Sequence, residues 1–262
     1  MMVQDLIVKL GWTGFSLPFL AVGLYTMNKG RKQRARSERI AATETTRIGN
    51  VRPGTVEVKG TARPAEDANV FDSPIWTEDA LATRVEVEKW ESSGQGGGNW
   101  ETVHEEETAV PIAVDDGTAE VRVELPADGG LNVERTRTKV GSGDEPPEPI
   151  RRFLETRDDI DEATRRELGP LSFGERRRYS EGVIAPDEEV YVLGTAREEQ
   201  AGWGDRKYVI DEPTDSGDFV LSDKSETELI REGKRGGLVP LAFGGLLTVV
   251  GTLLSIYPWL AM

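Results

Sequence analysis

The C-terminal stretch Gly236–Met262 contains no charged residue. A bilayer's hydrocarbon core is about 30 Å thick and needs about 20 apolar residues at about 1.5 Å per helical residue, and this stretch is longer than that. Trp259 and Tyr257 lie near its end, where interfacial aromatic residues occur in membrane helices. A buried core helix of a soluble protein is the alternative, although such helices rarely run this long without a charge. We therefore predict a transmembrane helix over residues 233–262.

A second apolar stretch, Leu10–Met27, lies near the N-terminus and is shorter and less apolar. A cleaved signal peptide would carry basic residues before its apolar run and small residues at a cleavage site after it, whereas here the basic residues follow the run. We predict an uncleaved N-terminal tail and transmembrane helix over residues 1–30. A basic juxtamembrane helix or linker is expected over residues 31–50.

Basic residues follow the first apolar stretch and precede the second, so both clusters flank the same central region. The positive-inside rule then predicts an integral membrane protein with two spans, a cytoplasmic central domain and both termini outside. Basic juxtamembrane residues also attract anionic lipid headgroups, by about 1 kcal/mol each, which makes membrane lipids an expected partner. The lipid-headgroup candidates are Arg31, Lys32, Arg34, Arg36, Lys234 and Arg235.

The charge balance is acidic, with 47 Asp and Glu against 32 Lys and Arg and a net charge of -15. Because nucleic acids bind basic surfaces, nucleic acid is not an expected partner of the domain. Few Lys and many carboxylates are typical of proteins that work in concentrated salt, where the screening length falls to about 3 Å. We predict a halophilic source, with an ordinary acidic protein as the alternative. The absence of cysteine from the sequence excludes disulfides, thiolate nucleophiles and cysteine-ligated metals within it.

The central region alternates apolar and polar residues, as strands with one buried face do. Thr55–Ala62 and Ala82–Trp90 show this pattern, and Trp100–Val103 resumes extended structure after a Gly-rich tip, which predicts a hairpin. Pro111–Leu125 predicts another hairpin, turning at Asp115–Thr118. Further strands are predicted over Arg178–Ile184, Glu189–Ala196, Tyr208–Ile210 and Phe219–Ser222.

Several helical segments complete the predicted elements. Short helices or helix extensions are expected over Ser37–Ile48, Ile150–Arg157, Asp161–Leu168 and Ser225–Glu232. The first of these ends at Asn50–Gly54, and the two middle ones are expected to pack on one side of the sheet. The predicted fold class is mainly β (α+β). We expect an antiparallel β-rich barrel or sandwich over residues 51–232 with a few short helices, flanked by two transmembrane helices.

His104 is the single histidine and precedes Glu105 and Glu106. A general base among carboxylates is one interpretation, but no nucleophile is identifiable beside it, and a solvated strand face is favoured. In an alternating strand His104 and Glu106 share one face and Glu105 lies on the other. The acidic turn at Asp115–Thr118 lacks the ligand spacing of an EF-hand calcium loop, which favours a plain turn. We predict no catalytic, cofactor-binding or metal site.

One basic cluster lies away from the membrane flanks, at Arg176, Arg177 and Arg178. It could receive an acidic partner or a lipid headgroup, which makes these three arginines partner-surface candidates. Pairing with surrounding carboxylates is the favoured alternative, because surface ion pairs are common and contribute little free energy.

Seven motifs follow one another along the chain in a fixed order. They are Pro53–Ala62, Ser73–Pro74, Ala82–Glu88, Pro111–Val123, Tyr179–Glu181, Ile184–Glu188 and Val190–Gly194. With the two-span layout, they resemble the GIDE family, membrane-anchored ubiquitin ligases of mitochondria, in the domain between the two spans. Eukaryotic relatives end in a RING finger whose two zinc ions require eight Cys or His ligands, and a single histidine without cysteine cannot supply even one four-ligand site. The resemblance therefore implies the membrane-side domain and not the ligase chemistry.

The leading functional hypothesis is a membrane-anchored, non-catalytic interaction or scaffold protein with a GIDE-like domain and an unidentified protein partner. The first alternative is an enzyme: E3 ubiquitin transferase-like activity that requires a separate RING partner, or a hydrolase that uses His104. The second is a lipid- or envelope-organising membrane protein, whose binding would follow the two basic flanks.

Overall fold

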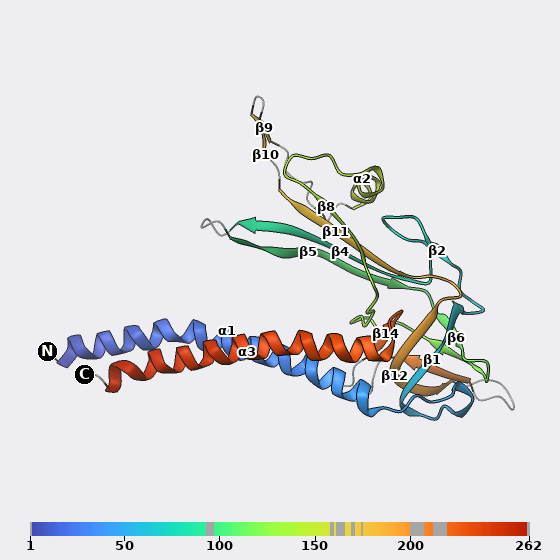
Figure 1. Ribbon diagram of the computed structural model, residues 1–262, viewed down its shortest axis with the longest axis horizontal. Helices are drawn as coiled ribbons and strands as arrows, with labels where there is room; N and C mark the ends of the chain where they lie inside the picture. The colour runs from blue at the N-terminus through green and yellow to red at the C-terminus, as the bar shows by residue number, and fades with distance from the viewer. Residues whose placement is uncertain are drawn as a thin grey trace. The chain divides into compact units, whose positions relative to one another are not determined.

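The computed structural model describes residues 2–92, 97–157, 160, 166–168, 171–173, 175–199, 207–211 and 219–260 (Figure 1). The chain divides into two compact units, Met1–Thr43 with Glu226–Met262, and Glu44–Ser225. The first unit is a pair of long helices, and the second contains the strands.

The helical unit pairs α1 (Met2–Ala42) with α3 (Glu226–Leu260) in an antiparallel arrangement (Figure 1). The two backbones come very close where glycines face each other. A Cβ atom on Gly30 would lie 2.8 Å from the carbonyl oxygen of Gly237, and one on Gly244 would lie 2.6 Å from that of Gly23. Side chains do not tolerate such short contacts with backbone, so glycine at these positions permits the close approach of the helices.

Small residues recur at every seventh position along this contact. They are Ser16, Gly23, Gly30 and Ser37 on α1, and Gly237, Gly244 and Gly251 on α3, and all are buried. A seven-residue repeat keeps one face of a helix against its partner. The buried hydroxyls of Ser16 and Ser37 donate to the backbone oxygens of Thr13 and Arg34 (2.8 and 2.9 Å), so neither is left without a partner.

Large apolar side chains are exposed on both helices. Among the described residues, Glu226–Tyr257 is the one segment long and apolar enough to cross a membrane, with a mean hydropathy of 2.0 over an 18-residue window of which 11% is buried. α1 does not meet this criterion, although it exposes large side chains such as Tyr25, at 70%. Length and composition thus agree with the predicted C-terminal span, and the second predicted span is not confirmed.

α1 ends at Ala42, so the predicted extension to Ile48 is wrong. The residues that follow pair with the β unit instead. The Thr46 amide donates to the backbone oxygen of Glu57 (2.7 Å), and the Thr45 hydroxyl donates to the fully buried Glu57 carboxylate (2.6 Å). Threonine is β-branched and suits an extended chain, so pairing with a strand overrides continuation of the helix.

Five strands of the β unit close into a barrel, in the order β1, β6, β7, β13, β12 and back to β1, and β14 also pairs with β12. All pairs are antiparallel except that of β7 with β13. Inward side chains such as Val58, Val192 and Ile210 are fully buried. The elements are η1 (Ile48–Asn50), β1 (Gly54–Pro64), β6 (Ile112–Asp115), β7 (Glu120–Val123), β12 (Glu189–Glu199), β13 (Lys207–Asp211) and β14 (Val220–Ser222).

A second, open antiparallel sheet pairs its strands in the order β5, β4, β11, β8. They are β4 (Ala82–Ser92), β5 (Gly98–Ala109), β8 (Thr136–Val140) and β11 (Arg177–Ile184). α2 (Glu148–Glu155) covers one face, where Ile150 and Phe153 pack with Val85, Val87 and Tyr179. The short helix predicted over residues 150–157 is therefore confirmed, and it packs on one side of this sheet.

Two small hairpins complete the described elements. They are β2 (Phe71–Asp72) with β3 (Asp79–Ala80), and β9 (Arg166–Leu168) with β10 (Leu171–Phe173). The helix predicted over residues 161–168 is wrong at 166–168, which form β9; residues 161–165 lie outside the described part of the chain. Gly169 and Pro170 come next in the sequence, and a Gly-Pro pair opposes a helix that runs up to it.

The β-rich fold class is confirmed, and for the larger sheet the barrel replaces the sandwich alternative. Every predicted strand is present, with boundaries that differ by a few residues. β8 was not predicted, because its sequence, Thr-Arg-Thr-Lys-Val, contains a single apolar residue and so does not alternate between apolar and polar residues.

The glycine contact between the helices predicts a selective effect of adding one methyl group. We expect Gly244→Ala to weaken the helix pair by about 1–3 kcal/mol, because its Cβ would lie 2.6 Å from the backbone oxygen of Gly23. Gly245→Ala is the matched control, since nothing lies within 4 Å of its Cβ. Thermal unfolding of the full chain in detergent micelles compares the two. A Gly244→Ala Tm at or above that of the control would contradict the close packing.

Candidate functional site

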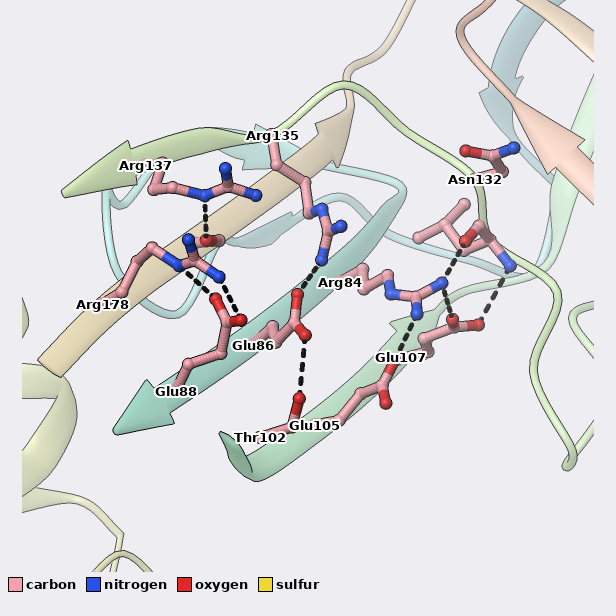
Figure 2. Close-up of polar contacts among 12 residues, drawn as sticks. Arg84, Glu86, Glu88, Thr102, Glu105, Glu107, Asn132, Arg135, Arg137 and Arg178 are labelled. Atoms are coloured by element: carbon pink, nitrogen blue, oxygen red, sulfur yellow. Dashed lines mark hydrogen bonds and ion pairs between the residues drawn. The ribbon is translucent and has the colours of Figure 1, made fainter. Parts of the chain in front are cut away.

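One face of the four-stranded sheet carries mostly polar side chains, many of which Figure 2 shows. The opposite face holds the apolar residues that pack against α2. Side chains alternate along a strand, so every second residue reaches the polar side. We call this polar side the charged face. Its residues are Arg84, Glu86, Glu88 and Trp90 of β4, Trp100, Thr102, Glu105 and Glu107 of β5, Arg178 and Ser180 of β11, and Arg135, Arg137 and Lys139 on or next to β8.

A β-bulge in β5 decides which residues reach the charged face. Val103 has no partner residue opposite it on β4. One extra residue shifts the alternation of side chains by one position. As a result Trp100 and Thr102 share a face with Glu105, although an unbroken alternation would place them on opposite sides.

Arg84 cross-links one end of the charged face (Figure 2). Its guanidinium pairs with the carboxylates of Glu105 and Glu107, the latter at 2.9 Å, and donates to the backbone oxygen of Leu131 (2.8 Å). Glu107 in turn accepts from the backbone amides of Gly130 and Leu131 (2.8 and 3.0 Å). These contacts fix β4, β5 and the segment before β8 to one another.

Two more ion pairs continue across the strands. Arg135 pairs with Glu86, which also accepts from the Thr102 hydroxyl (3.1 Å). Arg178 donates through two nitrogens to both carboxylate oxygens of Glu88. Bidentate, charge-assisted hydrogen bonds of this kind are stronger and more directional than neutral ones. The charges of this face thus hold its own strands together.

An aromatic pair lies at the far end of the charged face. Trp90 and Trp100 are directly opposite in register, with ring centroids 5.4 Å apart in an edge-on arrangement. The Arg178 guanidinium lies 4.6 Å from the centroid of the Trp100 ring. Both rings are partly exposed, and the pair with Glu88 holds Arg178 in place. Trp and Arg are the residues most enriched among those that dominate protein–protein binding energies. We call Trp90, Trp100 and Arg178 the Trp–Arg cluster.

Exposed cations lie beside this cluster on the β8 side. Arg137 donates to the Ser180 hydroxyl (3.2 Å), and Lys139 is opposite Arg178 in register. Both side chains are exposed, and neither forms an ion pair with a residue that the structure describes. This edge of the face is therefore available to an anionic group.

A buried carboxylate on the α2 side of the sheet positions a neighbouring loop. Glu181 is 2% exposed, and it accepts from the amides of Ile75 (2.8 Å) and Trp76 (3.0 Å) and from the Ser73 hydroxyl (3.1 Å). Ser73 also accepts from the Glu78 amide (3.1 Å). Two of the motifs noted in the sequence, Ser73–Pro74 and Tyr179–Glu181, are thus in direct contact.

A family model described as GIDE, E3 ubiquitin ligase, matches residues 82–254. The match begins at the first residue of β4, covers the charged face and includes most of α3. The chain belongs to the GIDE family. No curated protein and no solved structure matches it. The family resemblance predicted from the motifs is confirmed. The description of the GIDE family links the family to E3 ubiquitin ligases.

In this GIDE domain the three partner-surface candidates have different surroundings. Arg176 is exposed, and its backbone oxygen accepts from the Trp90 amide (2.9 Å). Arg177 is buried and pairs with Glu175 at 3.2 Å, while Arg178 belongs to the Trp–Arg cluster. Pairing with carboxylates is therefore present for two of the three, and a role in partner binding stays a prediction.

His104 lies on the face that α2 covers, together with Glu106, as the alternation predicts. Its Nε2 atom is 3.6 Å from the Glu106 carboxylate, which pairs with Arg157 at 2.6 Å. Its ring centroid lies 6.3 Å from that of Phe153 in α2. The His104 side chain is 10% exposed, so the solvated environment favoured from the sequence is wrong. The helix that covers this face, which the alternation of the strand does not encode, buries it.

The carboxylates of the acidic turn bind backbone amides. Asp115 accepts from Gly117 (2.7 Å), and Asp116 accepts from the amide and hydroxyl of Thr118 (2.9 and 2.6 Å) and from the Ile48 amide (2.8 Å). Burial raises the pKa of Asp116, but these hydrogen bonds and one from the Ala119 amide outweigh it and lower the pKa to about 2. The turn therefore fastens η1 to the barrel.

The lipid-headgroup candidates lie on the helix pair. Arg31, Lys32, Arg34 and Arg36 belong to α1, and Lys234 and Arg235 belong to α3. Arg34 lies 3.5 Å from Glu38, one turn further along α1. Of the Trp–Arg cluster, sequence reasoning named Arg178 as a candidate but neither tryptophan. The signal for the tryptophans was their placement on either side of a predicted hairpin tip.

The Arg178–Glu88 pair predicts a large loss of stability when one partner is removed. We expect Arg178→Met to lower the free energy of unfolding by about 2–4 kcal/mol, because Glu88 would keep a nearly buried charge without its partner. Arg63→Met is the control, since the Arg63 and Asp187 side chains are 55% and 71% exposed and a solvent-exposed pair contributes little to stability. Urea unfolding measures both. Adding Glu88→Met to Arg178→Met is expected to recover stability, and equal small losses for the two single variants would contradict the role of this pair.

The hydrogen bonds of Asp116 predict a pH-dependent contribution to stability. Its folded pKa of about 2 lies below the reference value of 3.8, so the stabilisation is present above about pH 4 and is lost as the pH falls towards 2. We expect Asp116→Ala to lower the free energy of unfolding by about 1–3 kcal/mol at pH 7 and by much less near pH 2. Asp128→Ala, at an exposed turn position, is the control. A deficit that stayed constant from pH 7 to pH 2 would contradict this assignment.

Proposed function

We propose that this GIDE-family chain is a membrane-anchored, non-catalytic interaction module, in which two transmembrane helices hold a β domain that binds a protein partner. The Trp–Arg cluster is the observation that carries the proposal. Its aromatic rings are partly exposed, and Arg178 is held by Glu88 before any partner arrives. Such preorganisation reduces the entropy that binding costs.

The surroundings of the cluster favour an acidic partner segment. Arg137 and Lys139 are exposed next to Arg178, whereas the carboxylates of the charged face are occupied by arginines. A partner with aromatic or apolar residues beside Asp or Glu would complement both the rings and the cations. Charge complementarity of this kind contributes mainly to specificity and to the rate of association.

The helix pair supports anchoring through two spans. Leu20 of α1 lies against Gly251 of α3, so the uncharged stretch 10–28 runs alongside the uncharged part of α3. Phe15 and Leu24 are exposed on α1, as lipid-facing residues are. The basic flanks favour a cytoplasmic β domain and outside termini. Labelling of a Glu66→Cys variant by a membrane-impermeant maleimide in sealed right-side-out vesicles would contradict that orientation.

Affinity capture with the full chain in detergent tests the partner surface. We expect the Trp90→Ala/Trp100→Ala variant to recover at least about tenfold less of the partner that wild type captures, because buried Trp anchors dominate binding energy. Val70→Ala, an exposed apolar residue outside the charged face, is the control and should capture as wild type does. Unchanged recovery by the Trp variant, or no reproducible partner for wild type, would contradict the proposal.

A second candidate function follows from the family description. The chain could act in ubiquitin-type transfer if a separate RING-containing protein supplied the zinc module. The captured partner distinguishes the two candidates. A zinc-binding partner that supports conjugation only together with this chain would favour the ligase-like role, and a partner without such activity would favour the interaction module.

A further inference from the structure

The antiparallel register of the helix pair brings together two basic segments that are far apart in the sequence. A Cβ atom on Gly233 would lie 2.6 Å from the Cβ atom of Ser37. Gly30 lies against Gly237 and Leu241, so residues 29–39 of α1 run antiparallel to residues 231–241 of α3, and the basic residues of α3 lie in the first part of that stretch, 231–235. We call the two segments 29–39 and 231–235 the basic collar.

The collar is strongly positive in a chain that is acidic overall. Its two segments contain nine Lys and Arg and two Glu, whereas the whole chain has a net charge of -15. Arg31, Lys32, Lys234 and Arg235 are exposed, and none of them forms an ion pair with another residue that the structure describes. These four cations are therefore available to anions from outside the chain.

The collar lies next to the exposed apolar surface of the same helices. Val239 is 73% exposed and follows Arg235 by about 6 Å along the helix axis, at about 1.5 Å per residue. The headgroup layer of a bilayer extends about 5–8 Å beyond the hydrocarbon on each side. When the apolar surface lies in the hydrocarbon, Lys234 and Arg235 therefore lie at the depth of the lipid phosphates. Arg31 and Lys32 follow Gly30, which lies against Gly237 and Leu241, and their long side chains reach the same layer by extending along the helix.

We propose that the basic collar binds the phosphates of anionic lipid headgroups through Arg31, Lys32, Lys234 and Arg235. The proposal rests on the membrane anchoring of the helix pair. A guanidinium can donate two parallel N–H groups to one phosphate, and an ammonium adds a compact charge. A lipid fits better than a free anion, because the cations are exposed on both helices beside an apolar surface that acyl chains would cover.

Lipid retention by the full chain tests the collar. Wild type reconstituted in phosphatidylcholine vesicles with a minor fraction of labelled phosphatidylglycerol should retain that lipid over labelled phosphatidylcholine after detergent exchange. We expect Arg31→Gln/Lys32→Gln/Lys234→Gln/Arg235→Gln to lower this enrichment at least about tenfold. The charge-matched control neutralises four exposed arginines of the β unit, Arg52, Arg63, Arg151 and Arg197, and should change it by less than about twofold.

Four outcomes would overturn the inference. Unchanged enrichment in the collar variant, or an equal loss in the control, would show that these cations do not select the lipid. Loss of enrichment with inorganic phosphate but not with sodium chloride of equal ionic strength would indicate a free-anion site instead. Extraction by alkaline carbonate distinguishes a failure of membrane anchoring from a failure of lipid binding. Release of wild type from the membrane would overturn the anchoring itself. Retention of wild type, with unchanged enrichment in the collar variant, would overturn lipid binding by the collar alone.

Discussion

Closure of the barrel through β12 is the constraint on which the rest of the β unit depends. β12 pairs with β1 over the whole range from Gly54–Ala196 to Thr61–Glu189, and its other edge pairs with β13 and β14. A closed barrel has no free edge that would pair with another chain. A tight turn, in which Asp187 has a φ of 63°, joins β11 of the second sheet to β12 of the barrel. Because β12 is fixed in the barrel, this turn also fixes where the second sheet begins.

The second sheet uses its two faces for different purposes. One face buries apolar residues beneath α2, and the other presents a ladder of Arg and Glu. Partly buried charges are costly to desolvate and are tolerated when each has a well-placed partner. The pairs made by Arg84, Arg135 and Arg178 meet this condition, and they join β4, β5, β11 and the segment before β8. The polar face is therefore held rigid by its own charges.

Sequence patterns predicted where helices and strands occur better than they predicted the surroundings of individual residues. Alternation located β4, β5, β11 and β12, whereas β8 escaped because its residues are mostly polar and pair with a strand far along the chain. His104 was assigned the correct face and the wrong exposure, since α2 covers that face. The helix expected over residues 161–168 failed where β9 pairs with β10. Each miss reflects a contact between segments that no local period encodes.

The sequence by itself determined the apolar length of the C-terminal stretch, the excess of acidic charge, the alternating strands and the family. These properties depend on residue type and on short spacings, which can be read directly from one amino-acid sequence. The tertiary structure alone decided that the larger sheet closes, that a bulge at Val103 turns Trp100 towards Arg178, and that Gly30 meets Gly237. Such features depend on register between distant segments. Register is set by packing in three dimensions, where one extra residue or one missing side chain changes which groups meet.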